Sequence, residues 1–246
     1  MGKSIQAAND ILKYIFNNTQ PSYQQYLTPA GWTSTGWTGS WAGGWTNGAS
    51  NTTALSNTLA AVSGNAYNID VPVMGMTAGS FTITFGGVTT SAYNAIGYTS
   101  TLLTAVSAGT LSITPTAAFN GSIYILIDLA YLYFSLHSQD PSQGANAGLQ
   151  SNYEIAYTGY NRVGVVGTTA GFTVATNTVS NATLVQFPVC TGSTATATYF
   201  AIGLANAPTT ANELLVSGAL ANVGGLAIST GIQPSFPIGT LTQTET

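Results

Sequence analysis

The sequence of 246 residues is poor in charge. It has three Lys or Arg residues against seven Asp or Glu residues, so 4% of the chain is charged, where about 25% is usual. Nucleic-acid binding needs clustered Lys and Arg side chains to neutralise phosphates, and three cations exclude it. Cys190 is the single cysteine, which excludes a disulfide within the chain and leaves packing or assembly as the source of stability.

Long apolar runs are also missing. The longest is IYILIDLAYLYF, residues 123–134, and Asp128 interrupts it. This run is well short of the ~20 residues that a membrane-spanning helix needs. The first residues, MGKSIQAAND, lack the apolar segment of a signal peptide. We therefore expect no membrane insertion and no Sec-dependent export.

Catalytic chemistry has few residues to use. His137 is the one histidine, which excludes zinc sites built on histidine pairs. Ser135, His137 and Asp140 are close enough in the sequence for a Ser–His–Asp arrangement. We favour the simpler interpretation, in which His137 lies in a loop or at a strand end and makes ordinary hydrogen bonds. No catalytic or cofactor-binding residue is predicted, and the chain is not expected to be an enzyme.

The carboxylates support the same expectation. They are Asp10, Asp70, Asp128, Asp140, Glu154, Glu213 and Glu245. Glycoside hydrolysis needs two carboxylates at one site, and Asp70 is the one acid among residues 20–120. A structural calcium at Asp70 is a weaker alternative, because one carboxylate makes a poor cage for a hard cation; no metal site is predicted. Glu154 and Arg162 are expected to form a structural ion pair across neighbouring strands.

The sequence pattern predicts one short helix followed by β-strands. Residues 5–16, IQAANDILKYIF, carry apolar side chains at helical spacing and predict an amphipathic α-helix. Beyond them, short runs rich in Thr, Val, Ile and Phe alternate with Gly, Asn, Ser and Pro, the pattern of an all-β sandwich or barrel. The predicted strands are 80–85, followed by the turn signal Gly86-Gly87, then 101–106, 110–115, 161–167, 171–176, 183–189, 197–204, 213–220 and 225–230. The polar residues 137–152 are predicted to be a loop.

Four segments of the second half carry a family resemblance. They are YFSLHSQDPSQGANAG (133–148), SNYEIAYTGYNRVGVV (151–166), GFTVATNTVSNATLVQFPVCTG (171–192) and STGIQPSFPIGTLT (229–242). In wording, order and spacing they resemble a tail-fibre-like or decoration family of tailed-bacteriophage virion structural proteins. The resemblance implies a β-sandwich with a short N-terminal helix that attaches to the virion.

About 100 residues separate that helix from these motifs, and they carry a second resemblance. AGWTSTGWTGSW and LSITPTAAFNGSIYI look like the galactose-binding-like jelly-roll modules of phage tail and cell-surface proteins. We therefore expect an all-β protein with two jelly-roll-like β-sandwich domains and a short N-terminal α-helix. Residues 1–19 and 121–246 would form the virion-attachment domain, and residues 20–120 the inserted jelly roll.

All four tryptophans lie in GWTSTGWTGSWAGGWTNG, residues 31–48. Alternate residues of a strand share a face, so Trp37, Trp41 and Trp45 would face one way unless Gly43-Gly44 breaks the strand. Three roles stay open for the indoles: filling the sandwich core, forming a subunit interface, where Trp is enriched, or stacking on sugars. We expect Trp37 and Trp41 to point inward and Trp32 and Trp45 outward.

These observations predict a non-enzymatic bacteriophage virion protein that is assembled in the host cytoplasm and needs no cofactor. The first interpretation is a capsid decoration or head-fibre protein with a protruding carbohydrate-binding-like domain. The second is a tail-fibre or tail-tip protein that recognises the host receptor. The expected partners are the major capsid protein or tail proteins, with host-surface glycans as a further candidate. Low charge favours a permanent homo-oligomer, taken to be a trimer.

Overall fold

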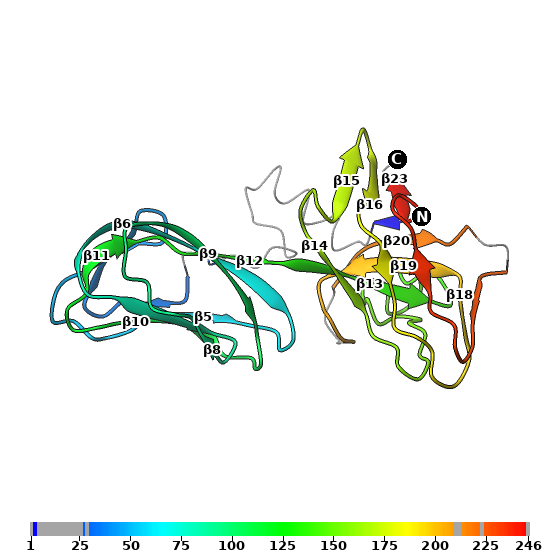
Figure 1. The fold of residues 1–246 in the computed structure, drawn as a ribbon, viewed down its shortest axis with the longest axis horizontal. Coiled ribbons are helices and arrows are strands. Elements are labelled where there is room, and N and C mark those ends of the chain that lie inside the picture. The colour runs from blue at the N-terminus through cyan, green and yellow to red at the C-terminus, as the bar shows by residue number, and fades with distance from the viewer. Residues whose placement is uncertain (1, 4–26, 28–29, 209–212, 222–223, 245–246) are drawn as a thin grey trace. The chain divides into compact units, whose positions relative to one another are not determined.

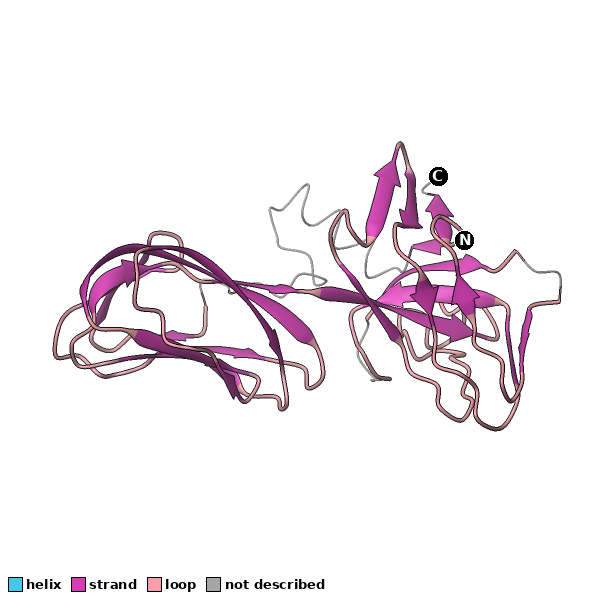
Figure 2. Cartoon of the chain, in the orientation of Figure 1, coloured by secondary structure: helices cyan, strands magenta, loops and turns pink. Residues whose placement is uncertain are grey.

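The computed structural model describes residues 2–3, 27, 30–208, 213–221 and 224–244. Among these residues are strands, turns and loops but no helix (Figure 2), which confirms the all-β prediction. The α-helix predicted at residues 5–16 lies outside the described residues. The described part of the chain contains no helix that is long and apolar enough to span a membrane.

The chain divides into two compact units between Ala130 and Tyr131. We call the described residues from Leu27 to Ala130 the sandwich unit. Gly2–Lys3 and the described residues from Tyr131 onward form the C-terminal unit. The division falls later than the expected boundary at 120/121, because residues 120–129 pair with a strand of the sandwich unit.

The sandwich unit consists of two antiparallel sheets, seen as two layers in Figure 1. The first sheet has the order β2 (Trp32–Thr33), β5 (Leu55–Ala60), β10 (Thr110–Pro115), β7 (Phe81–Phe85) and β8 (Val88–Thr89). The second has the order β12 (Leu126–Leu129), β6 (Ala66–Ala78), β11 (Asn120–Ile123), β4 (Gly44–Asn47) and β3 (Trp37–Ser40). β9 (Gly97–Thr104) pairs with the other edge of β6.

Alternation along the strands builds the core of this unit. In β7, Phe81, Ile83 and Phe85 are fully buried while the two threonines between them are half-buried. The facing strand β6 turns Tyr67 toward the same core, where its ring meets that of Phe85 edge to face at 5.1 Å between centroids. Each such side chain contributes about 1.5–3 kcal/mol by leaving water, so the two sheets are held together by their inner faces.

Two local details of the sandwich unit concern backbone geometry. Gly86 and Gly87 have φ values of 59° and 78° and join β7 to β8. A two-residue hairpin with positive φ at both positions favours glycine, and the predicted turn is confirmed. The longest strand, β6, was not predicted. It contains Pro72, which lacks an N–H group and usually marks a sheet edge or an irregularity. Here Pro72 lies where the partner changes from β12 to β11, and its carbonyl accepts from the Tyr124 N–H at 2.8 Å.

The C-terminal unit is built on a five-stranded antiparallel sheet. Its order is β1 (Gly2–Lys3), β20 (Leu214–Ala219), β19 (Tyr199–Gly203), β13 (Tyr131–His137) and β14 (Val163–Val166). Three smaller antiparallel sheets accompany it: β15 (Phe172–Ala175) with β16 (Thr178–Asn181) and β23 (Thr242–Thr244), β17 (Val185–Gln186) with β22 (Ser235–Phe236), and β18 (Ala195–Ala197) with β21 (Leu226–Ile228). The jelly-roll likeness expected for both units stays a prediction.

The two faces of the five-stranded sheet differ in chemistry. One face presents Phe134, Leu136 and Phe200 to the apolar core of the unit. The other face carries polar side chains that are nevertheless fully buried, among them Ser135 and Ser217. Both serines lie opposite Ala201 of β19. Ser135 is its partner in β13, and Ser217 is its partner in β20. The sheet register therefore gathers buried polar groups on one face.

Candidate functional site

The four tryptophans do not form one exposed platform. Trp37 and Trp45 are 5% and 7% exposed, and Trp32 and Trp41 are half-buried against the same core. Trp37 points inward as predicted, but the outward prediction for Trp45 was wrong. β3 and β4 form a hairpin in which Gly39 lies opposite Trp45. Gly39 and Trp37 are alternate residues of β3 and share a face, so Trp37 and Trp45 both face the core. Trp41 lies in the turn and is not fully inward.

Contacts tie these indoles to the sandwich unit. The Trp37 Nε1–H donates to the Thr53 carbonyl at 2.8 Å. The Trp32 and Trp45 rings are in contact, with 5.2 Å between their centroids. The Nε1–H of Trp41 is buried and has no hydrogen-bond partner among the described residues. Packing accounts for Trp37 and Trp45, and the partly exposed Trp32 and Trp41 keep some indole surface for a ligand or a partner.

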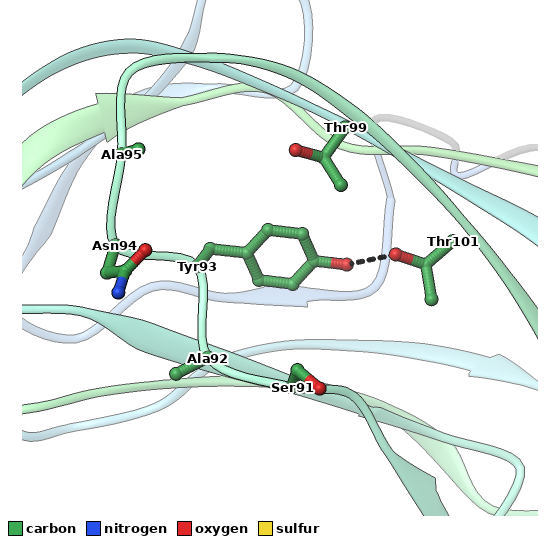
Figure 3. A pocket seen from close by; sticks show the side chains of 7 residues that line it. All are labelled: Ser91, Ala92, Tyr93, Asn94, Ala95, Thr99 and Thr101. Carbon is green, nitrogen blue, oxygen red and sulfur yellow. Dashed lines mark hydrogen bonds between the residues drawn. The ribbon is translucent and has the colours of Figure 1, made fainter.

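A polar pocket lies elsewhere in the same unit, beside the loop between β8 and β9 (Figure 3). We call it the Tyr93 pocket; its volume is about 220 Å³ and it is lined by Ser91, Ala92, Tyr93, Asn94, Ala95, Thr99 and Thr101. The Tyr93 ring extends from the loop, and its hydroxyl is 3.0 Å from Thr101 Oγ1. Sequence reasoning missed this pocket, because neither the loop nor β9, the strand that follows it directly, carries a motif.

In the C-terminal unit, His137 ends β13 and is fully buried. Its Nδ1 is 2.8 Å from the Asn152 carbonyl, which requires a hydrogen on Nδ1, so Nε2 accepts from the Ser135 hydroxyl at 2.8 Å. Burial lowers the pKa of His137 to about 4, and the imidazole is neutral at pH 7. The prediction of a strand-end histidine with ordinary hydrogen bonds is confirmed.

The Ser–His–Asp alternative is not formed. The His137 Nδ1 faces a backbone carbonyl, whereas Asp140 Oδ1 accepts from Ser217 Oγ at 2.7 Å and from Ser142 Oγ at 2.8 Å. Burial alone would raise the pKa of Asp140, but these hydrogen bonds lower it overall. Ser135 has no exposed surface and therefore offers no hydroxyl to a substrate.

The predicted ion pair between Glu154 and Arg162 is confirmed. Arg162 Nη2 and Nε donate to the two carboxylate oxygens at 2.7 and 2.9 Å, and both side chains are almost completely buried. Tyr160 Oη also donates to Glu154 at 2.9 Å. Burial first, and then the charge of Glu154, raises the pKa of Tyr160 well above its usual range. The tyrosine is a permanent donor to the carboxylate.

Two amides complete this buried network, and sequence reasoning missed both. Gln150 Nε2 donates to the Tyr133 carbonyl at 2.7 Å and to Ser135 Oγ at 3.0 Å, while its Oε1 accepts from Arg162 at 3.0 Å. Asn152 Nδ2 donates to the carbonyl of Pro141 at 3.1 Å. Both amides lie in the predicted loop 137–152. This segment has no periodic pattern, so the sequence did not indicate that it packs back against β13.

The calcium alternative at Asp70 gains one carboxylate neighbour. Asp70 and Asp128 lie on adjacent strands, opposite Leu126 and Asn68 respectively. Burial first, and then the charge of Asp70, raises the pKa of Asp128. Within the described residues, no group of three His, Cys, Asp or Glu side chains is placed to hold a metal ion.

Comparison with known proteins gives one match. Residues 126–244 match the family described as podophage GP4 fiber I protein gp80, which covers just under half of the chain. No curated protein matches the chain, and no solved structure does. The matched range begins in β12 and continues through the described end of the C-terminal unit. A fibre protein is a structural component, which is consistent with the expected absence of enzyme activity. The match supports a phage virion fibre protein, a virion-associated structural protein that assembles with other virion components.

Proposed function

We propose that this chain is a non-enzymatic capsid decoration or head-fibre protein. The observation that carries the proposal is that the fibre match spans the C-terminal unit and leaves nearly all of the sandwich unit outside it. We assign the attachment role to the C-terminal unit, with the major capsid protein as partner, because the fibre match lies there. The domain assignment of the sequence analysis, an attachment sandwich and an inserted jelly roll, is part of the proposal.

The sandwich unit is proposed to be carbohydrate-binding-like and to contact host-surface glycans. Partial exposure of Trp32 and Trp41 supports such a contact, because indole faces stack well on other ring systems and favour interfaces. A virion that carries many copies converts weak single contacts into useful avidity. Subunit packing is the other role for the same exposed indole surface.

The protein is proposed to be a homotrimer. Its support is a surface with almost no charge, which suits a permanent assembly in which desolvated charges would be costly. We expect light scattering of the purified full chain to give the mass of three chains. A monomer at micromolar concentration would contradict this part of the proposal and leave the virion role open.

Copy number separates the decoration role from its alternative. A capsid decoration protein follows the symmetry of the shell, so we expect on the order of hundreds of copies per virion. Densitometry or quantitative mass spectrometry of purified virions measures the number, with the major capsid protein as the internal standard. Fewer than about fifty copies would exclude decoration of the whole shell.

The second candidate is a tail-fibre or tail-tip protein for host receptor recognition. The description of the matched family as a fibre protein favours it. A tail fibre would be present in a few to dozens of copies per virion. A low copy number, together with labelling of this chain at the tail, would establish this alternative.

A further inference from the structure

Two hollows flank the same loop of the sandwich unit. The first is the Tyr93 pocket, and the second has a volume of about 360 Å³ and is lined by Met76, Thr77, Ala78, Gly79, Asn94, Ala95 and Ile96. Asn94 and Ala95 line both hollows. A water molecule occupies about 30 Å³, so the Tyr93 pocket has room for roughly seven waters or one small ring. Its neighbour adds room for a second group.

The polar groups of these hollows are available for binding. The side chains of Ser91, Asn94 and Thr99 are exposed and make no hydrogen bond to another described residue. Figure 3 shows Asn94 on the loop, next to the start of the Tyr93 side chain, and Thr99 on β9, near the Tyr93 ring. A carboxamide donates two hydrogen bonds and accepts others, and a hydroxyl does both. These groups match the hydroxyls of a polyol, which also donate and accept.

The loop is held firmly in place. The backbones of Phe81 and Tyr93 exchange two hydrogen bonds, at 3.2 and 2.8 Å. Their rings stack at 5.0 Å between centroids with an angle of 14° between the planes. The bond from the Tyr93 hydroxyl to Thr101 adds a third anchor, to β9. A site held in this way loses little conformational entropy when it binds a ligand.

Charge restricts the class of ligand. Residues 27–130 contain no Lys, Arg or His, and their charged residues are Asp70 and Asp128. Carboxylate, sulfate and phosphate groups are bound in proteins chiefly by Arg and Lys. A sialylated or phosphorylated glycan would find no cation in this unit, whereas a neutral one needs none.

We infer that the two hollows form a binding site for a neutral saccharide, with one ring in the Tyr93 pocket and Asn94 in contact with both parts. This inference rests on the proposed carbohydrate-binding role of the sandwich unit. It moves the site from the tryptophans to the loop around Tyr93. The hydroxyl of Thr99 and the amide of Asn94 supply the directional contacts, and Met76 and Ile96 supply apolar surface for the second group.

The experiment uses the full chain on an array of neutral and acidic saccharides, followed by calorimetric titration of the best neutral ligand. The variants are Asn94→Ala and Thr99→Val for the inferred site, Trp32→Ala for the indoles, and Ser63→Ala as a control. Ser63 is exposed and lines neither hollow. We expect binding of a neutral saccharide that Asn94→Ala weakens about tenfold, which corresponds to the loss of about two hydrogen bonds. Ser63→Ala should bind as the parent does.

Three outcomes would overturn the inference. If no neutral saccharide binds, the site has no such ligand, and the virion role is still decided by copy number. If Trp32→Ala abolishes binding while Asn94→Ala keeps it, the indoles are the carbohydrate site. If acidic saccharides alone bind, the charge argument fails. Circular dichroism of each variant verifies that the sandwich is folded.

Discussion

Replacing Arg162 with methionine is expected to destabilise the C-terminal unit by about 3–5 kcal/mol, the usual cost of leaving a buried charge without its partner. The guanidinium makes a two-pronged contact with Glu154 and also donates to Gln150 Oε1 and to the Ala205 carbonyl, at 3.0 and 2.9 Å. Its side chain is 1% exposed, so water cannot replace these contacts. After the substitution, Glu154 keeps the Tyr160 hydroxyl as a donor, which cannot neutralise a carboxylate.

Urea unfolding of the full chain measures this loss, and a double variant supplies the control. Arg162→Met with Glu154→Gln removes both charges, so part of the stability lost in Arg162→Met should return. Arg162→Lys keeps the charge but not the planar fork, and its stability should lie between those of the parent and Arg162→Met. Equal stability of the parent and Arg162→Met would mean that solvent reaches this pair.

The features that the sequence predicted are local ones. The hairpin at Gly86-Gly87 follows from the φ values that two adjacent residues must adopt, and the strands at 81–85 and 110–115 follow from alternation over a few residues. The contact between Glu154 and Arg162 joins residues close in the chain. In each case the determining interactions lie within about ten residues, the range that pattern reasoning covers.

The features that it missed depend on distant pairing. Trp45 is buried because β4 pairs with β11, whose Ile123 lies opposite Trp45, and nothing near residues 31–48 indicates that partner. The division at Ala130 depends on β12 pairing with β6, since IYILIDLAYLYF is one apolar run in the sequence.

The candidate sites were missed for a second reason, because the polar loops that form them carry no pattern. The Tyr93 pocket joins a loop to β9, and the buried network brings Gln150 and Asn152 back under a strand that ends at His137. A polar loop of this kind carries no periodic signal, so its destination is fixed only by the hydrogen bonds that it completes.

Acid is expected to destabilise the C-terminal unit through His137 as the pH falls from about 6.5 to about 4. Burial disfavours the imidazolium, and the Arg162 charge acts in the same direction, whereas the Asn152 carbonyl and the charges of Glu154 and Asp140 oppose it. The net result is a pKa of about 4 in the folded protein, against about 6.5 in an unfolded chain. Between these values the unfolded chain binds more protons, so stability falls as the pH falls.

The full effect between pH 6.5 and 4 is roughly 3 kcal/mol, because a tenfold change in proton affinity is worth about 1.4 kcal/mol. The hydrogen bonds explain why the folded state resists the proton. Nδ1 already carries a hydrogen toward the Asn152 carbonyl, and Nε2 accepts from Ser135 Oγ, which itself accepts from Gln150. If Nε2 of His137 were protonated, it could no longer accept the Ser135 hydrogen bond, and the Ser135 hydroxyl would have to turn its hydrogen elsewhere. Asp140, whose pKa is lowered, loses its contribution at still lower pH.

Because His137 is the one histidine of the chain, its imidazole signals in an NMR titration need no assignment by mutation. We expect them to stay at the neutral position down to about pH 5 and urea midpoints to decrease over the same titration. His137→Gln removes the titrating group, so the dependence on pH between 6.5 and 4 should flatten even if the variant is less stable at pH 7. A midpoint near 6.5 in the folded protein would contradict the prediction. It would mean that the network under the five-stranded sheet opens to water, and then the buried pair of Glu154 and Arg162 would lose its low-dielectric surroundings as well.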